Sequence, residues 1–171
     1  EELRKNIGLV LQDPFLYHGT IKSNIAMYQE ISDEQVQAAA SFVDADSFIK
    51  DLTQGYDAPV SERGSSFSTG QRQLLAFART VASQPKILIL DEPSSALDPI
   101  AEYELNKTIE AAAKDRTVIF ISHRLSTTRM ADRIYLFDGG KITEQGSHEE
   151  LMKQDGTYAK MFRVQAKKYQ G

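Results

Sequence analysis

Three short aliphatic runs constrain the fold most, because each ends at a polar residue suited to handling a phosphate group. The runs cover residues 7–11, 87–90 and 118–121, and they stop at Gln12, at Asp91 and Glu92, and at Ser122 and His123. Apolar runs without alternation are typical of strands buried on both faces, as in a parallel sheet covered by helices. Ligands bind beyond the carboxyl ends of such strands. An amide, an acid pair and an imidazole at one sheet edge predict a site for a metal-bound anion and its attacking water.

Composition narrows the class of protein. The chain has 171 residues, of which 41% are apolar and 26% charged, which is ordinary for one soluble globular domain. No apolar stretch approaches the roughly 20 residues that a membrane-spanning helix needs, and the first residues resemble no secretion signal. The net charge is −4, and no basic block with interleaved aromatics occurs, so nucleic acid is not expected as a partner. The absence of cysteine excludes disulfides, thiolate catalysis and cysteine-ligated zinc.

Capping and turn signals predict the remaining elements. A serine followed three positions later by Gln or Glu is a helix-start signature, and it occurs at Ser32, Ser68 and Ser147. We expect helices over 33–42 and 45–52, a loop over 53–66, a helix from Ser68 to just before Pro85, a helix over 99–113, a hairpin over 134–143 and a helical tail. The pattern predicts a mostly parallel sheet that is interrupted between residues 14 and 84 by a mainly helical insert.

Two motifs have both a chemical and a structural interpretation. Asp91 at the end of a buried strand could hold Mg²⁺, and Glu92 could polarise a water for attack on a terminal phosphate. The alternative is ordinary turn or capping chemistry after a strand. Ser68 with Gln71 is a capping box, but a helix start with a serine and a glycine also offers N–H groups to an anion.

The order of these motifs resembles the ATP-binding cassette (ABC) family of transporter ATPases over residues 3–169. Ser68 lies 23 residues before Asp91, and His123 lies 31 residues after Glu92. The matching segments are a Q-loop region at 9–13, 19–21 and 24–25, a signature sequence at 67–73, a Walker B strand at 87–92, a D-loop at 95–98 and a switch-histidine region at 122–126.

The resemblance implies an α/β fold of the partial P-loop NTPase type, with a mostly parallel sheet and a helical subdomain insert. Residues 1–13 and 85–171 would form the catalytic core of a single incomplete domain, and residues 14–84 the Q-loop and helical subdomain. The implied roles are Glu92 as the catalytic carboxylate, His123 on the γ-phosphate, Gln12 on Mg²⁺ or the attacking water, Asp91 on Mg²⁺, and Ser68, Thr69, Gly70, Gln71 and Asp98 at ATP shared with the opposite subunit. Asp98 is equally suited to capping the helix that starts at Pro99.

The subtype resembles exporters, on Gly19 to Ile21, Glu62 to Gly64 and the region after Ser122. This implies an ATP-hydrolysing motor on the cytoplasmic face of the cell membrane, with ATP and Mg²⁺ as cofactors. Its partners would be a transmembrane domain on the same polypeptide and a second nucleotide-binding domain, as a homodimer or heterodimer. His18 and His148 lack such a context, and we expect neither to act in catalysis.

The chain departs from the family pattern in three places. It contains no G-x-x-x-x-G-K-[ST] phosphate loop, so we expect a cassette lacking its N-terminal portion, and we expect these residues alone to bind ATP weakly and to be inactive. Thr69 and Ser61 replace glycines usual in the family. Because a β-branched residue disfavours positive φ and crowds a close backbone approach, Thr69 would weaken the ATP site that it serves, which favours one half of a heterodimeric exporter.

Two alternatives remain open from the sequence. One is a soluble ABC ATPase acting in DNA repair or translation. The repair type would need a long coiled coil between Q-loop and signature, whereas 55 residues without sustained heptads separate Gln12 from Ser68. A non-catalytic regulatory half or remnant cassette would be marked by loss of Glu92 or His123, and both are present.

Overall fold

The computed structural model describes residues 5–27, 29–94, 97 and 99–168. The chain packs into two compact units, Glu1–Ile121 and Ser122–Gly171.

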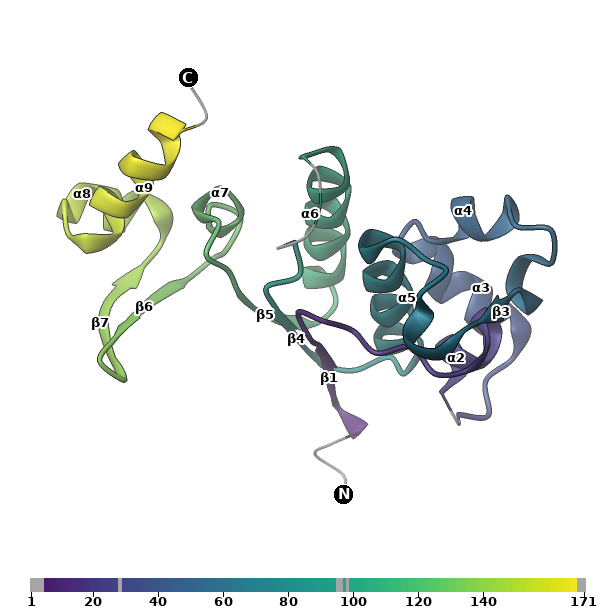
Figure 1. Cartoon of the computed structure of the whole chain (residues 1–171). Coiled ribbons are helices and arrows are strands. Elements are labelled where there is room, and N and C mark those ends of the chain that lie inside the picture. The colour runs from purple at the N-terminus through teal and green to yellow at the C-terminus, as the bar shows by residue number, and fades with distance from the viewer. Residues whose placement is uncertain (1–4, 28, 95–96, 98, 169–171) are drawn as a thin grey trace. The chain divides into compact units, whose positions relative to one another are not determined.

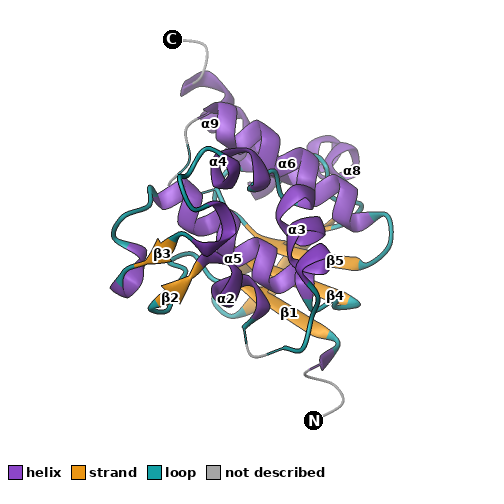
Figure 2. Ribbon diagram, turned by 90° about the vertical axis from the view of Figure 1, so that its right-hand side faces the viewer, coloured by secondary structure: helices purple, strands orange, loops and turns teal. Residues whose placement is uncertain are grey.

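The first unit is built on a parallel sheet of three strands in the order β1-β4-β5. These are β1 (Ile7–Val10), β4 (Ile87–Asp91) and β5 (Thr117–Ile121). Ile7 pairs with Ile87 and Ile87 with Thr117, so the strands start level and their carboxyl ends reach the same edge. Figure 2 shows the three strands side by side. All three predicted strands and the predicted α/β class with a parallel sheet are confirmed.

One face of this sheet is covered by α5 (Thr69–Ala82) and α6 (Pro99–Ala113), which stand on the same side of the strands (Figure 1). Gly8 permits the close approach of α5, because an added Cβ would lie 2.5 Å from Thr80 Cγ2 and 2.8 Å from Pro85 Cγ. Leu88 and Leu90 on this face are fully buried.

The other face differs from the prediction of strands buried on both sides. Leu9, Ile119 and Ile121 are 51%, 50% and 51% exposed, and no described helix of the first unit covers them. An unbroken aliphatic run indicates that both faces of a strand favour apolar packing. In the described residues of the first unit, only one of the two faces is covered by helices.

Between β1 and α5 lies the mainly helical insert. It contains β2 (Gly19–Thr20), α2 (Ile21–Ala26), α3 (Asp33–Phe42), α4 (Asp46–Lys50), a 3₁₀ turn (Gly55–Asp57), β3 (Pro59–Val60) and a second 3₁₀ turn (Glu62–Gly64). The predicted capping boxes at Ser32 and Ser68 form as reciprocal pairs of hydrogen bonds. The stretch 53–66, predicted as loop, contributes β3, which pairs antiparallel with β2.

The second unit contains α7 (Leu125–Thr128), the antiparallel pair β6 (Ile134–Asp138) and β7 (Lys141–Gly146), then α8 (His148–Gln154) and α9 (Thr157–Lys168). The predicted hairpin and the capping box at Ser147 are both present. Its core consists of Leu125, Ile134, Leu151 and Tyr158. Among the described residues of the chain, no helix has the length and apolar character required to cross a bilayer.

Candidate functional site

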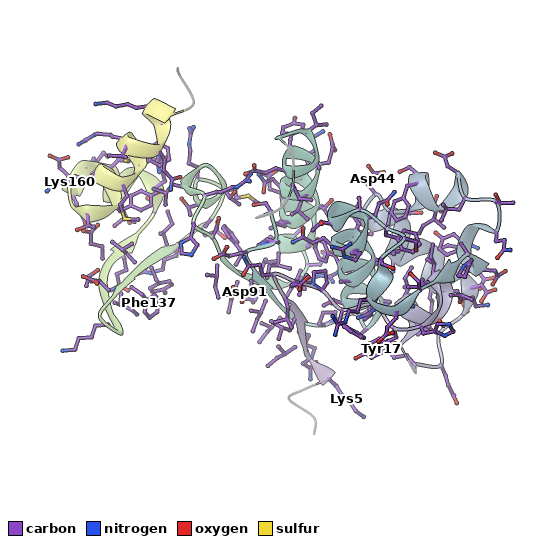
Figure 3. The ribbon with its side chains drawn as sticks, in the orientation of Figure 1. Lys5, Tyr17, Asp44, Asp91, Phe137 and Lys160 are labelled. Atoms are coloured by element: carbon purple, nitrogen blue, oxygen red, sulfur yellow. The ribbon has the colours of Figure 1, made fainter. Side chains whose placement is uncertain are left out.

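Two of the polar residues predicted to meet at the sheet edge are in contact. Gln12 follows β1, and Glu92 follows Asp91, the last residue of β4. Asp91 is labelled in Figure 3. Because β1 and β4 are parallel neighbours in level register, their carboxyl ends lie together. Gln12 Nε2 donates a long hydrogen bond of 3.3 Å to Glu92 Oε2.

The backbone at Glu92 is unusual. Its φ of 46° lies in the left-handed region, which a residue with a Cβ seldom adopts. Its N–H donates to the carbonyl of Ile121 at 3.0 Å, one step beyond the regular β4–β5 ladder, in which Asp91 pairs with Ile121. Left-handed non-glycine residues cost of the order of 1 kcal/mol and persist where the surroundings hold them. The backbone therefore turns at Glu92, so the Asp91 and Glu92 side chains do not alternate as they would in a continuing strand.

The donor set at this edge suits a hard divalent cation. Asp91 and Glu92 are half-buried carboxylates, and Gln12 adds an amide. Since a carboxylate only accepts hydrogen bonds, the amide must turn Nε2 toward Glu92, which leaves its oxygen available as a ligand. Among the described residues no three acidic or histidine side chains form a ready-made cage. The two carboxylates and the amide oxygen fit Mg²⁺, which commonly uses one or two carboxylates together with phosphate oxygens and water.

The signature-like segment opens α5. Ser68 Oγ accepts from Gln71 N at 3.1 Å, and Gln71 Oε1 accepts from Ser68 N at 2.9 Å. The capping use of Ser68 occupies its oxygen as an acceptor and leaves its O–H as a donor, so both interpretations of this motif are compatible. Gly70 lies under Leu97, whose Cδ2 would be 3.1 Å from an added Cβ. The glycine therefore lets the first turn of α5 approach the segment that follows β4.

Thr69 does not adopt the positive φ that would be unfavourable for a β-branched residue. It is the first residue of α5 and is absent from the described non-glycine residues with positive φ, so that part of the predicted cost of Thr69 does not arise. Its hydroxyl accepts from Arg72 Nη2 at 3.1 Å, while Arg72 Nη1 donates to the Phe67 carbonyl at 2.8 Å. The predicted D-loop residue Asp98 lies outside the described residues.

The segment after Gln12 is fixed by Asn24 of α2, which belongs to the predicted Q-loop region but was given no individual role, and by Arg79 of α5. The Asn24 side chain is buried and binds both the N–H and the carbonyl of Tyr17, each at 2.8 Å. Arg79 of α5 donates to Asn24 Oδ1, to the Asn24 carbonyl and to the Phe15 carbonyl, at 2.9, 2.8 and 2.9 Å. Burial lowers the pKa of the Arg79 guanidinium. In the sequence, an arginine between small residues on an otherwise apolar helix was the signal that Arg79 makes specific polar contacts.

The histidines fall in different surroundings. His123 is exposed in the second unit, two residues after β5, and its carbonyl accepts from Gln165 Nε2 at 2.7 Å. His148 lies against Tyr158 and Phe162, with Nδ1 2.9 Å from the Tyr158 hydroxyl. His18 is exposed.

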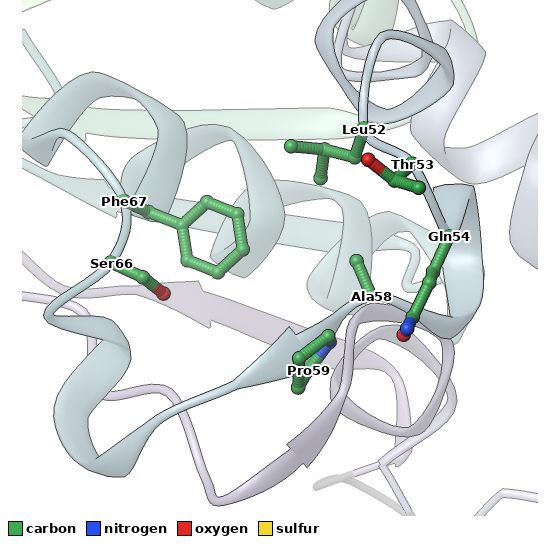
Figure 4. A pocket seen from close by; sticks show the side chains of 7 residues that line it. All are labelled: Leu52, Thr53, Gln54, Ala58, Pro59, Ser66 and Phe67. Carbon is green, nitrogen blue, oxygen red and sulfur yellow. The ribbon is translucent and has the colours of Figure 1, made fainter.

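A cavity of about 290 Å³ lies elsewhere in the first unit. Figure 4 shows its lining, which is Leu52, Thr53, Gln54, Ala58, Pro59, Ser66 and Phe67. No ionisable side chain faces it, so it offers nothing to balance the charge of a phosphate. The sheet edge, and not this cavity, is the candidate site.

Comparison with known proteins defines the class. The family model "ABC transporter" matches residues 1–95, and the chain belongs to that family. The match includes Gln12, the signature-like segment and the acid pair, and the fold is that of an exporter-type ATP-binding domain.

Individual relatives agree with this placement. The chain is 69% identical over 166 residues to a putative ABC transporter ATP-binding protein of Streptococcus pneumoniae, covering 97% of this chain and 28% of the relative. It is 44% identical to a probable multidrug resistance ABC transporter ATP-binding/permease protein of Bacillus subtilis, covering 96% of this chain and 25% of the relative. A solved bacterial Atm1-family ABC exporter with ATP bound superposes with a TM-score of 0.89 at 44% identity, covering 95% of this chain and 29% of that one. The chain therefore spans about a quarter of the length of these relatives.

Proposed function

We propose that this chain carries the hydrolytic carboxylates of an ABC exporter motor, which uses ATP hydrolysis to drive transport across a membrane. The observation that carries the proposal is the contact between Gln12 and Glu92 at the level ends of two parallel strands. Membership of the ABC transporter family and the likeness to an ATP-bound exporter support it.

Glu92 is the proposed general base. A carboxylate next to the terminal phosphate can accept a proton from the attacking water as that water becomes a nucleophile. The Gln12 amide, held by its hydrogen bond to Glu92, would orient this water or touch the metal. The left-handed backbone at Glu92 supports the assignment, since strained residues gather at functional sites.

Asp91 is the proposed Mg²⁺ ligand, with Gln12 beside it. Bound Mg²⁺ would neutralise phosphate charge and so favour phosphoryl transfer. We assign His123 to the γ-phosphate, where an imidazole stabilises developing charge. His123 follows Ile121 by two residues, and the Ile121 carbonyl is the acceptor for Glu92 N–H.

The start of α5 is the proposed contribution to a second nucleotide. Ser68, Thr69, Gly70 and Gln71, together with Asp98, which follows Gln71 by 27 residues, would face ATP held mainly by a partner cassette, in a homodimer or heterodimer. A helix start of this kind presents backbone N–H groups to phosphate oxygens.

We further propose a transmembrane domain on the same polypeptide, which would place the motor at the cytoplasmic face of the membrane. The relative named ATP-binding/permease protein supports this arrangement. The division into a core (1–13, 85–171) and an insert (14–84) stays a prediction, as does weak ATP binding by these residues alone.

The test is Glu92→Gln in the purified transporter that carries this chain. Removing the base while keeping the shape should lower ATP turnover by at least about a hundredfold. Nucleotide binding and the melting temperature should change little. Glu110→Gln, on an exposed position of α6, is the matched control and should leave turnover unchanged. Wild-type turnover in the Glu92→Gln protein would identify the chain as a regulatory, non-catalytic half and refute the proposal.

A further inference from the structure

Within the second unit, the side chain of Gln165 makes hydrogen bonds to the backbone around His123. Gln165 is a half-buried residue of α9. Its Nε2 donates to the His123 carbonyl at 2.7 Å, and its Oε1 accepts from Leu125 N at 3.0 Å. One amide thus grips the backbone on both sides of Arg124.

This grip supplies something that the local sequence lacks. Arg124 is the N-cap residue of α7, and its side chain makes no capping hydrogen bond. The first N–H groups of a helix need acceptors from outside the helix. Gln165 provides the acceptor for Leu125 N, so α9 caps α7 from a distance of 40 residues along the chain.

The platform that carries Gln165 is itself well fixed. Tyr158 of α9 is 1% exposed, and its hydroxyl lies 2.9 Å from both Thr128 Oγ1 of α7 and His148 Nδ1 of α8. The N–H of Tyr158 donates to Glu144 of β7 at 3.0 Å. Because α9 is held at its start by three elements, the Gln165 amide near its end acts from a rigid base.

We propose that Gln165 is a positioning residue, which fixes the backbone of residues 123–125 and thereby the direction of the His123 side chain. The inference rests on the proposed function, since it assigns Gln165 a role through His123. A side chain with one donor and one acceptor at the correct separation is required, and only an amide of this length provides both. Displacing a catalytic group by about 1 Å can cost up to a hundredfold in rate.

The test uses ATP turnover by the purified transporter with three variants of one position. Gln165→Met keeps length and helix propensity but removes both hydrogen bonds. Gln165→Glu keeps the acceptor and sets an oxygen against the His123 carbonyl. We expect kcat to fall about tenfold in both, with KM for ATP changed less than twofold. Gln165→Asn, which is too short for both contacts, should behave like Gln165→Met. Gln154→Met, at the exposed end of α8, is the control and should match wild type.

A double-mutant cycle separates positioning from general support of the fold. If Gln165 acts through His123, adding Gln165→Met to His123→Ala should lower kcat no further. Independent, multiplicative losses with a lowered melting temperature would overturn the inference. Wild-type kcat in Gln165→Met would also overturn it, provided that His123→Ala alone is impaired. Unimpaired His123→Ala would instead contradict the role of His123 in the proposed function.

Discussion

Replacing Asn24 by alanine should destabilise the first unit strongly. The side chain makes four hydrogen bonds: it accepts from Tyr17 N and Arg79 Nη2 and donates to the carbonyls of Tyr17 and Thr20, all at 2.8 to 3.0 Å. At about 1 kcal/mol each, their loss amounts to about 4 kcal/mol. Tyr17 is 43% exposed, so water can replace part of this. We therefore expect the free energy of unfolding to fall by about 3 kcal/mol.

Asn24→Asp sharpens this prediction. The aspartate keeps both acceptor contacts and adds a charge beside the half-buried Arg79 guanidinium, but it loses both donors. We expect a loss of about 1 to 2 kcal/mol, smaller than for alanine. Gln37→Ala, at an exposed site on α3, is the control and should stay within about 0.5 kcal/mol of wild type.

The measurement is urea unfolding, followed by tyrosine fluorescence and by far-ultraviolet circular dichroism. The two probes should give the same midpoint if the unit unfolds cooperatively. A loss below about 1 kcal/mol for Asn24→Ala would refute the reasoning, because it would mean that water satisfies the Tyr17 and Arg79 groups equally well.

Two further predictions concern packing and pH. Gly8→Ala places a Cβ against Thr80 and Pro85 and should lower stability by about 1 to 3 kcal/mol, detected as a lower melting temperature; an unchanged value would show that α5 can move away from β1. Hydrogen bonds from the backbone at the start of α9, first from Tyr158, lower the pKa of Glu144, so its contribution is present above about pH 4.3 and is lost as pH falls through the lower folded pKa. Glu144→Gln should therefore remove part of the acid dependence seen in thermal melts, and identical pH profiles would contradict this.

Helix starts could be predicted from sequence because their signals are local. The boxes at Ser32, Ser68 and Ser147 each combine two residues three positions apart, and the structure closes each with two hydrogen bonds. The strand pairing of β2 with β3 could not be predicted in this way. Each strand has two residues, too few to show a period, and the paired residues, Gly19 with Val60 and Thr20 with Pro59, are far apart in the chain.

Helix periodicity gave the position of α5 but not its buried face in full. The helix contains two adjacent leucines, of which the structure buries Leu75 completely and leaves Leu74 half-buried. Adjacent leucines differ by about 100° around a helix, so either one fits a broad apolar stripe. The neighbours across the interface, which the helix sequence does not contain, decide between them.

The residues of the candidate site also differ in how well the sequence predicts them. Gln12, Asp91 and Glu92 were found because side chains that handle phosphate are chemically distinctive and stand at strand ends, where parallel register brings the strands level. Asn24 was recognised only as part of the Q-loop region and Gln165 was not singled out, because the groups that these side chains hold are mostly backbone N–H and carbonyl groups. Every residue offers those groups, so no motif marks the partner. A sequence therefore identifies the residues that touch a ligand more readily than the amide side chains that fix the loops carrying those residues. The structure adds most by identifying these amide side chains.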